Sequence, residues 1–244
     1  MDTKEFKEIL FALAEKNGCG AYLQGDRADI FCRLTEHMLK VNESFNLTAI
    51  KDPMRVALLH YVDSIKGAEV FAEGAKIIDI GCGAGFPSLP LAICRPDLQI
   101  IAVDSTAKRV RYVEETAKML GLTNLKAITA RAEDLGRDKN YRECFDFATA
   151  RAVDSLPVLC ELCLPLVRIG GFFAAMKGKG ASDELSAARR AIPTLGGKLE
   201  ETLDTPLYDL QGEKYEHATV LIRKEKATPD TYPRVYTKIA KSPL

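Results

Sequence analysis

The sequence predicts an α/β protein with a mostly parallel, Rossmann-like sheet of seven strands, an antiparallel hairpin at one edge and an N-terminal helical extension. Three observations support this prediction. Short β-rich segments alternate with helical ones from residue 76 onward, only helical patterns precede them, and the last two β-rich segments have no helix between them. Strand–helix alternation implies right-handed crossovers and a parallel sheet covered on both faces, whereas two strands without an intervening helix can pair antiparallel.

The N-terminal part carries apolar residues at helical spacing. Residues 4–17 and 27–45 have this periodicity. Pro53 suits the first turn of a third helix over residues 53–66, and Asp52 suits its cap. Because these helices precede every strand, they form an extension ahead of the sheet.

From residue 76 the pattern becomes that of an α/β core. We therefore expect a helical extension over residues 1–70, packed on a core over residues 71–244 that ends in a basic tail. The expected strands are 76–80, 98–103, 125–129, 145–150, 171–176, 197–204 and 217–223. The expected helices of the core are 87–94, 106–120, 154–167 and 181–192.

Composition and charge exclude several classes of protein. The 34 basic and 34 acidic residues balance, so the chain as a whole has no general attraction to polyanions. No apolar run reaches the ~20 residues that a membrane span requires. The N-terminus has acids among its bases and reads as an amphipathic helix rather than a signal peptide. We expect a cytoplasmic protein with no membrane partner.

The cysteines and histidines indicate neither a disulfide framework nor a metal site. Seven cysteines are an odd number at irregular spacing, which favours reduced thiols. Cys160 and Cys163 form a single CxxC inside an apolar, helix-like stretch, so we expect them to pack in the core. The three histidines, His37, His60 and His217, are scattered, and we predict no metal.

The segment KIIDIGCGAGFPS, residues 76–88, joins the first strand to the next helix and carries a glycine-rich turn. Its glycines are Gly81, Gly83 and Gly85. Glycine allows positive φ and removes the Cβ that would hold a ligand away from the main chain, and in such sheets ligands bind beyond the carboxyl ends of the strands. The dinucleotide fingerprint GxGxxG would need glycine at position 86, where Phe86 stands. The GxGxG spacing after Asp79 instead resembles motif I of class I S-adenosylmethionine (AdoMet) methyltransferases, where the acid helps to bind the positive amino-acid end of the cofactor.

Two further sites follow the next strands in order. Asp104 ends the second strand, where a carboxylate can accept hydrogen bonds from both ribose hydroxyls of a nucleoside. The segment ARAED follows the third strand, and Ala132 and Glu133 are the candidates there to bracket an adenine ring. The order of the three sites supports a nucleoside cofactor.

Eight segments of the chain carry a resemblance to a known family. They are FNLTAI (45–50), HYVDSI (60–65), IDIGCGAGFPSLPLAI (78–93), VDSTAKRVRYV (103–113), ARAED (130–134), ARAVDSL (150–156), GGFFAAMKG (170–178) and TYPRVYTKIAKSPL (231–244). With these segments in register, the chain resembles the glucose-inhibited division protein B family, the small-subunit ribosomal RNA methyltransferase G enzymes. The chain departs from the family pattern at Thr237 and Ile239, where a glycine and a proline are usual, and at Ser88, where glycine is frequent.

The resemblance implies a class I methyltransferase fold, AdoMet as methyl donor and methylation at N7 of a guanine in 16S ribosomal RNA. The implied partner is that RNA or the small ribosomal subunit. Carried over by motif, the implied cofactor contacts are Gly81, Phe86, Asp104, Ser105, Thr106, Ala132, Glu133 and Arg151.

The chemistry of this reaction decides which residue types to look for. Guanine N7 has a lone pair and no proton, so catalysis can rest on alignment with the methyl carbon and needs no general base. No catalytic residue is assigned, and the candidates for the target pocket are Arg151 and Lys177, after the fourth and fifth strands. The candidates for RNA binding are Lys108, Arg109, Arg111, Lys177 and Arg234.

Several alternatives stay open from the residues alone. One is an AdoMet-dependent methyltransferase that acts on another RNA, a protein or a small molecule. Others are a nicotinamide-dependent oxidoreductase, which Phe86 disfavours, and a noncatalytic RNA-binding module, which the intact glycine turn disfavours. Asn46 with Thr48, and His60 with Asp63, could either contact substrate or act as helix-cap and packing residues that tie the extension to the core.

Overall fold

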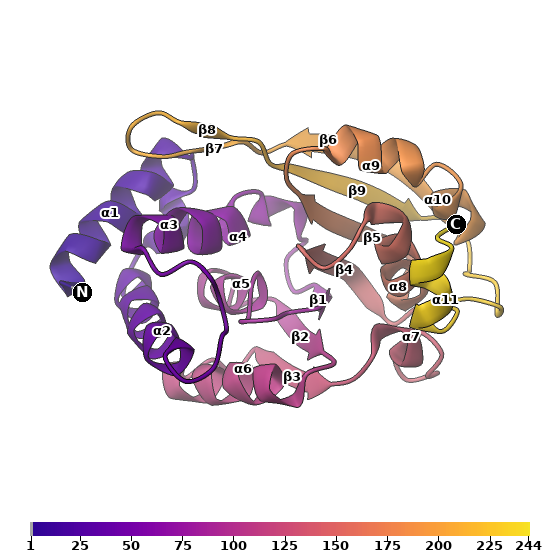
Figure 1. Cartoon of the computed structure of the whole chain (residues 1–244), viewed down its shortest axis with the longest axis horizontal. Coiled ribbons are helices and arrows are strands. Elements are labelled where there is room, and N and C mark those ends of the chain that lie inside the picture. Colours follow the sequence, from indigo (N-terminus) through magenta and orange to yellow (C-terminus); the bar gives the residue numbers. More distant parts are fainter. Residues whose placement is uncertain (1) are drawn as a thin grey trace.

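The computed structural model describes residues 2–244, and its centre is a seven-stranded sheet in the order β3-β2-β1-β4-β5-β9-β6 (Figure 1). The strands are β1 (Lys76–Ile80), β2 (Gln99–Asp104), β3 (Leu125–Thr129), β4 (Phe145–Arg151), β5 (Val167–Lys177), β6 (Gly197–Asp204) and β9 (Ala218–Lys224). The pairs from β3 to β5 are parallel, whereas β9 runs antiparallel to both of its neighbours. The predicted antiparallel pair at the edge is confirmed, with β9 inserted between β5 and β6.

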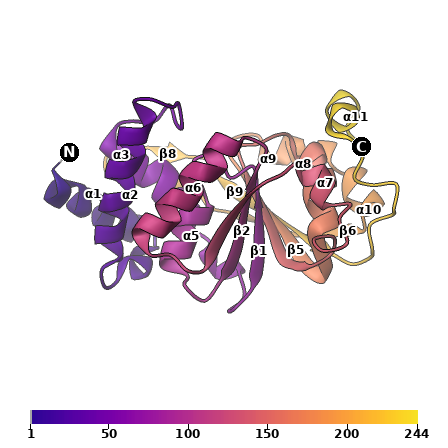
Figure 2. The same ribbon diagram turned by 90° about the horizontal axis from the view of Figure 1, so that it is seen from below.

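Helices flank this sheet on both sides. They are α1 (Thr3–Lys16), α2 (Arg27–Asn42), α3 (Pro53–Val56), α4 (Asp63–Ile65), α5 (Ser88–Cys94), α6 (Ala107–Leu120), α7 (Ala132–Leu135), α8 (Leu156–Cys163), α9 (Ala181–Ala187), α10 (Ala191–Thr194) and α11 (Tyr236–Lys241). A π-helical segment over Ala57–Val62 joins α3 to α4. Figure 2 shows β1 and β2 between α6 on one side and α7 and α8 on the other, with α1 and α11 at opposite ends of the molecule.

Local chemistry explains where several helices begin and end. The Asp2 carboxylate accepts hydrogen bonds from the first amides of α1, and Asp52 caps α3 in the same way, 2.9 Å from the Arg55 amide. Gly121 ends α6 with a left-handed φ of 75°, as a C-terminal glycine commonly does.

Two predicted helices are shorter than expected. The helix expected over residues 154–167 ends at Cys163, because Pro165 cannot donate a helical hydrogen bond, and β5 then begins at Val167. The helix expected over residues 181–192 is split into α9 and α10 ahead of Pro193. The sequence also did not predict α7, α11 or the short hairpin of β7 (Leu207–Tyr208) and β8 (Lys214–Tyr215).

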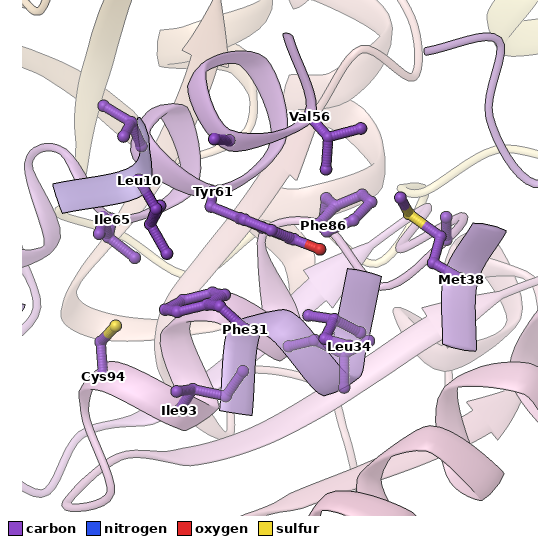
Figure 3. Close-up of a cluster of buried hydrophobic side chains, with 14 of the residues drawn as sticks. Leu10, Phe31, Leu34, Met38, Val56, Tyr61, Ile65, Phe86, Ile93 and Cys94 are labelled. Carbon is purple, nitrogen blue, oxygen red and sulfur yellow. The ribbon is translucent and has the colours of Figure 1, made fainter. Parts of the chain in front are cut away.

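The N-terminal helices share one hydrophobic core with the glycine-rich turn. Leu10 of α1, Phe31 of α2 and Tyr61 of the π-helical segment meet Phe86 of the turn and Ile93 of α5 (Figure 3). All are almost fully buried, and each such side chain contributes roughly 1.5–3 kcal/mol on leaving water. The Tyr61 hydroxyl is satisfied by Thr35 of α2 at 2.7 Å. The position of the turn therefore depends on packing with the N-terminal helices.

The C-terminal segment is fixed to α8 and to the loop before β4 by charged side chains. The Arg142 guanidinium donates to the carbonyls of Gly136, Thr228 and Tyr232 at 2.6, 2.6 and 2.9 Å. Arg234 makes a two-point ion pair with Glu161, a residue of α8 that is fully buried, at 2.9 and 2.7 Å. These bonds hold the C-terminal segment against α8 and the loop before β4.

A buried lysine supports the same segment from inside. Lys224, at the end of β9, is fully buried and donates to the Leu164 carbonyl and to the Thr228 hydroxyl. Its ammonium lies 3.2 Å from the Glu143 carboxylate, and burial lowers its pKa to about 8. Two of the tail's basic residues, Lys224 and Arg234, are thus neutralised inside the protein.

The cysteine prediction is confirmed in α8, where Cys160 and Cys163 are fully buried and burial raises the pKa of both thiols. Across residues 2–244, no helix combines the length and the apolar character needed to cross a bilayer. Within the same range, no three side chains of His, Cys, Asp or Glu converge as they would around a metal ion.

We expect the substitution Arg234→Ala to lower the free energy of unfolding by about 3–5 kcal/mol, because it leaves the buried Glu161 carboxylate without its cation. Urea denaturation measures the change. Arg223→Ala, at an exposed arginine of β9, is the matched control and should stay within about 0.5 kcal/mol of the wild type. Equal stability of the two variants would contradict a structural role for the ion pair.

Candidate functional site

A cavity of about 340 Å³ opens at the carboxyl ends of β1 to β4, where sheets of this type bind ligands. Its lining residues come from the ends of β1 to β4 and the loops that follow them, and from α6, α7, α8 and α11. They are Ile80, Gly81, Val103, Asp104, Ser105, Arg109, Ala130, Arg131, Ala132, Glu133, Ala152, Val153, Leu162 and Tyr236. A larger hollow of about 550 Å³ lies at the amino ends of the same strands, near Lys76, Gln99 and Phe145. The cavity at the carboxyl ends is the candidate site because the glycine-rich turn and Asp104 meet there.

Asp104 is held in a fixed orientation at the end of β2. The amides of Gly83 and Thr106 donate to its two carboxylate oxygens at 3.1 and 2.8 Å. Arg109 of α6 approaches the same carboxylate at 3.6 Å. A carboxylate has about four lone-pair sites, so two amide donors leave capacity for the paired hydroxyls of a ribose. This arrangement fits the sugar of a nucleoside.

The three glycines of the turn have different surroundings, although all three have positive φ values of 75°, 55° and 88°. A Cβ at Gly85 would overlap Leu89, so this glycine permits close packing inside the protein. A Cβ at Gly83 would meet only the Gly81 carbonyl, at 3.9 Å. A Cβ at Gly81 would overlap the side chain of Val153, which lies against the turn from the cavity side. A ligand that reaches the Gly81 main chain therefore meets Val153 first.

Asp79 lies buried at the end of β1, behind the turn and outside the cavity lining. One of its carboxylate oxygens accepts a hydrogen bond from the Ser88 hydroxyl. The other, Oδ1, is buried and has no hydrogen-bond partner among residues 2–244. Burial raises the pKa of Asp79 to about 6, although Ser88 and Arg151 oppose the shift. An unpartnered buried carboxylate oxygen at this place fits a cationic ligand group such as an ammonium.

The Phe86 ring contacts both a histidine and an arginine. The His60 ring lies parallel to it at 4.4 Å between centroids, and the Arg151 guanidinium carbon lies 5.4 Å from its centroid. Burial and the Arg151 charge lower the pKa of His60 to about 4, so this imidazole is neutral at pH 7. Its Nε2 is hydrogen-bonded to Thr48 at 2.9 Å. Phe86 does not line the cavity, and its ring fixes the turn from behind.

The Arg151 guanidinium is directed at the N-terminal helices. Its Nη1 donates to the Leu59 carbonyl at 2.9 Å and to the Asp63 carboxylate at 2.7 Å. Asp63 also lies 2.8 Å from His217, and these partners lower its pKa against the effect of burial. Thr48, His60 and Asp63 were candidates either for substrate contact or for tying the extension to the core. Their contacts match the second role.

The structure brings only part of the predicted site together. Asp104, Ser105, Gly81, Ala132, Glu133 and Arg109 line the cavity. The predicted residues that do not line it are Asp79, Gly83, Gly85, Phe86, Thr106, Arg151, Lys108, Arg111, Lys177 and Arg234.

The basic candidates outside the cavity have other partners. Arg234 is paired with Glu161, as described above, and Lys177 is buried at the end of β5, 2.7 Å from both the Glu184 carboxylate and the Asp154 carbonyl. Lys108 lies over the Phe45 ring at 5.9 Å, and Arg111 is exposed on α6.

Sequence reasoning did not predict eight of the residues that line the cavity: Ile80, Val103, Ala130, Arg131, Ala152, Val153, Leu162 and Tyr236. Val153 lies in a segment that the sequence marked, and Arg131 directly precedes the predicted pair Ala132 and Glu133. Leu162 and Tyr236 carried no signal, because Leu162 looks like any core leucine of a helix and Tyr236 lies in the divergent tail.

Solved structures share this fold at low sequence identity. A SAM-dependent methyltransferase from Methanosarcina mazei superposes with a TM-score of 0.51 at 16% identity, over 64% of this chain and 95% of that chain. The M. jannaschii TYW2 structure in complex with AdoMet superposes with a TM-score of 0.53 at 15% identity, over 66% of this chain and 74% of that chain. The strand order, the glycine turn and the orientation of Asp104 define a class I AdoMet-dependent methyltransferase.

Sequence similarity identifies the family of this chain within that fold class. The family model described as rRNA small subunit methyltransferase G matches residues 27–205, and the chain belongs to this family. A protein named ribosomal RNA small subunit methyltransferase G from Lactobacillus delbrueckii is 46% identical over 82% of this chain and 84% of its own length. A protein of the same name from Acetivibrio thermocellus is 38% identical over the full length of both chains.

We expect Asp104→Asn to weaken AdoMet binding at least tenfold, because the amide presents one acceptor oxygen in place of two to the Gly83 and Thr106 amides and to a ribose. Isothermal titration calorimetry with AdoMet in the absence of RNA measures the dissociation constant. Glu115→Gln, at an exposed acid of α6, is the control for a general charge effect and should bind as the wild type does. Unchanged affinity in the Asp104 variant would exclude its role in the cofactor site.

We expect the AdoMet affinity to fall as pH decreases from 7 to 5. The pKa of Asp79 is raised to about 6, so its carboxylate is ionised above this pH and neutral below it, and only the ionised form attracts an ammonium. The limiting slope is about tenfold per pH unit. Asp79→Asn should remove this dependence, and adenosine, which lacks the amino-acid end, should bind the wild type with a flat profile. An equally steep profile in the variant would assign the titration to another group.

Proposed function

We propose that this chain transfers a methyl group from AdoMet to N7 of a guanine in 16S ribosomal RNA, in the RNA itself or within the small ribosomal subunit. The observation on which the proposal rests is the Asp104 carboxylate, oriented by two amides beside the glycine turn and facing a cavity that can take a nucleoside. Family membership supports the ribosomal RNA as the substrate. The place of action is then the cytoplasm, where ribosomal subunits are assembled.

Bound AdoMet supplies an electrophilic methyl carbon on a sulfonium, and the protein's part is to orient and enclose the two reactants. Asp104 would hold the ribose, and Ala132 with Glu133 would flank the adenine. Ionised Asp79 would attract the ammonium end behind the turn. These contacts would fix the direction of the methyl carbon, and such alignment can contribute several kcal/mol to the rate.

The composition of the cavity wall supports a target atom that carries no proton. Among residues 2–244, neither a histidine nor a cysteine lines the cavity, and His60 is buried with its Nε2 bonded to Thr48. An amine or hydroxyl acceptor usually needs a general base, whereas guanine N7 attacks with a free lone pair. The wall does carry the carboxylates of Asp104 and Glu133, but the proposal assigns both to the cofactor, so the absence of an imidazole from the described wall fits attack by N7.

Basic side chains at the cavity mouth support an RNA substrate. Arg109 and Arg131 line the cavity and keep much of their side chains in solvent, at 42% and 60% exposure. Lys108 and Arg111 are exposed on the same helix as Arg109. A guanine inside folded RNA must be unstacked to enter such a site, at a cost of about a few kcal/mol, and contacts to the flanking phosphates offset part of it.

We expect the purified protein to transfer labelled methyl groups from AdoMet to a 16S ribosomal RNA transcript, and to transfer none when every guanosine of the transcript is 7-deazaguanosine. The replacement exchanges the nucleophilic nitrogen for a C–H group and keeps the Watson–Crick edge. Scintillation counting of precipitated RNA gives the incorporation. A transcript with 7-deazaadenosine, which keeps all guanine N7 atoms, is the control. Methylation of the 7-deazaguanosine transcript would show that the acceptor is an atom other than guanine N7, and would contradict the proposal.

A further inference from the structure

We propose that Tyr236, in the C-terminal helix α11, forms the outer wall of the cofactor cavity and packs on the nucleoside of AdoMet. The C-terminal segment would then be part of the cofactor site rather than only an RNA-binding tail. This inference depends on the proposed use of the cavity for AdoMet. It concerns a residue in the part of the chain that departs from the family pattern, next to Thr237.

The position of Tyr236 places it opposite the turn. The residue lines the same cavity as Gly81, Asp104 and Glu133, although it follows them by more than a hundred positions in the chain. Its hydroxyl donates to the Asp154 carboxylate at 2.8 Å, in the loop between β4 and α8. Its charged neighbours include Glu133 and Arg131, on the β3 side of the cavity. The ring thus spans the mouth between the loops after β3 and β4.

Anchored neighbours hold the ring in this place. Ile239, one turn along α11 and on the same face as Tyr236, is fully buried in the core beneath α8. Arg234, two residues before Tyr236, is fixed by Glu161. With anchors on both sides, Tyr236 has 37% of its surface exposed and directs its hydroxyl at the protein. Figure 1 shows α11 beside α8, at the end of the molecule opposite α1.

The chemistry of the ring suits a purine. A tyrosine offers a flat apolar face, and base–aromatic stacking does not depend on which hydrogen-bonding edge the base presents. Ala132 and Leu162 supply further apolar surface in the same cavity. An adenine beside Ala132 would be covered by Tyr236 on the solvent side, which would slow its escape.

The same hydrogen bond connects Tyr236 to the loop that covers the glycine turn. Asp154 follows Val153, whose side chain lies on Gly81, and Ala152 before it has a φ of 54°, which is unfavourable for a residue with a Cβ. One loop therefore contacts the turn at Val153 and the C-terminal helix at Asp154. Tyr236 is placed to respond to the movement of Val153 that a ligand on Gly81 requires.

The test is calorimetric titration of the full-length protein with AdoMet, and with S-adenosylhomocysteine, in the absence of RNA. We expect Tyr236→Ala to raise both dissociation constants about tenfold, because both ligands carry the same nucleoside. Tyr236→Phe keeps the ring and should stay within about threefold of the wild type. Val235→Ala, at an exposed neighbour outside the cavity lining, is the matched control and should show no change.

Thermal unfolding without ligand separates binding from folding. Tyr236 is partly exposed, so we expect its alanine variant to unfold at the temperature of the Val235→Ala variant, while losing more of the shift that AdoMet produces. Unchanged AdoMet affinity in Tyr236→Ala would overturn the inference, and a raised KM for the ribosomal RNA alone would assign the ring to the RNA. If the wild type bound no AdoMet, the proposed function itself would fall, and this inference with it.

Discussion

The stack of His60, Phe86 and Arg151 is the interaction on which the site depends. It joins three parts of the chain: the N-terminal helices, the glycine-rich turn and the end of β4. Because a neutral imidazole and a guanidinium both contact the Phe86 ring, a shift of the turn would disturb two aromatic contacts and, through Arg151, the bonds to Leu59 and Asp63. The glycine-rich turn also supplies the Gly83 amide that orients Asp104. The N-terminal helices thus help to position the candidate site through packing, at a distance from the cavity itself.

Charge has two separate roles in this molecule. Within the protein, Glu143 and Glu161 neutralise Lys224 and Arg234, and Glu184 neutralises Lys177, so these basic residues hold the fold together. Around the cavity mouth, Arg109 and Arg131 keep their positive charge near solvent, although each faces an acid. A balanced overall charge is therefore compatible with a nucleic-acid substrate. The electrostatic potential at the cavity mouth depends on the basic side chains exposed there, and not on those that are neutralised by ion pairs inside the protein.

The sequence predicted the strands closely because strand–helix alternation and glycine punctuation are local signals. β1, β3 and β6 have the predicted bounds, and the candidate cavity lies at the carboxyl edge of the sheet, where the sequence placed the site. The partners of charged residues could not be predicted, since a basic residue in a sequence does not reveal whether an acid distant in the chain will meet it. Arg234 and Lys177 show this limit. Tyr236 was missed for a related reason, because its position depends on anchors in α8. The assignment of individual cofactor contacts and the division of the chain at residue 70 stay predictions.

The short hairpin of β7 and β8 has a consequence for how the chain matures. The side chain of Asn17, after α1, bonds both the amide and the carbonyl of Tyr208 at 2.8 Å, and Lys66 bonds the Pro206 carbonyl. During synthesis on the ribosome, the first helices leave the exit tunnel long before residues 206–208 are made. These polar groups must stay hydrated in the meantime, so the N-terminal helices complete their contacts only when most of the polypeptide has been translated.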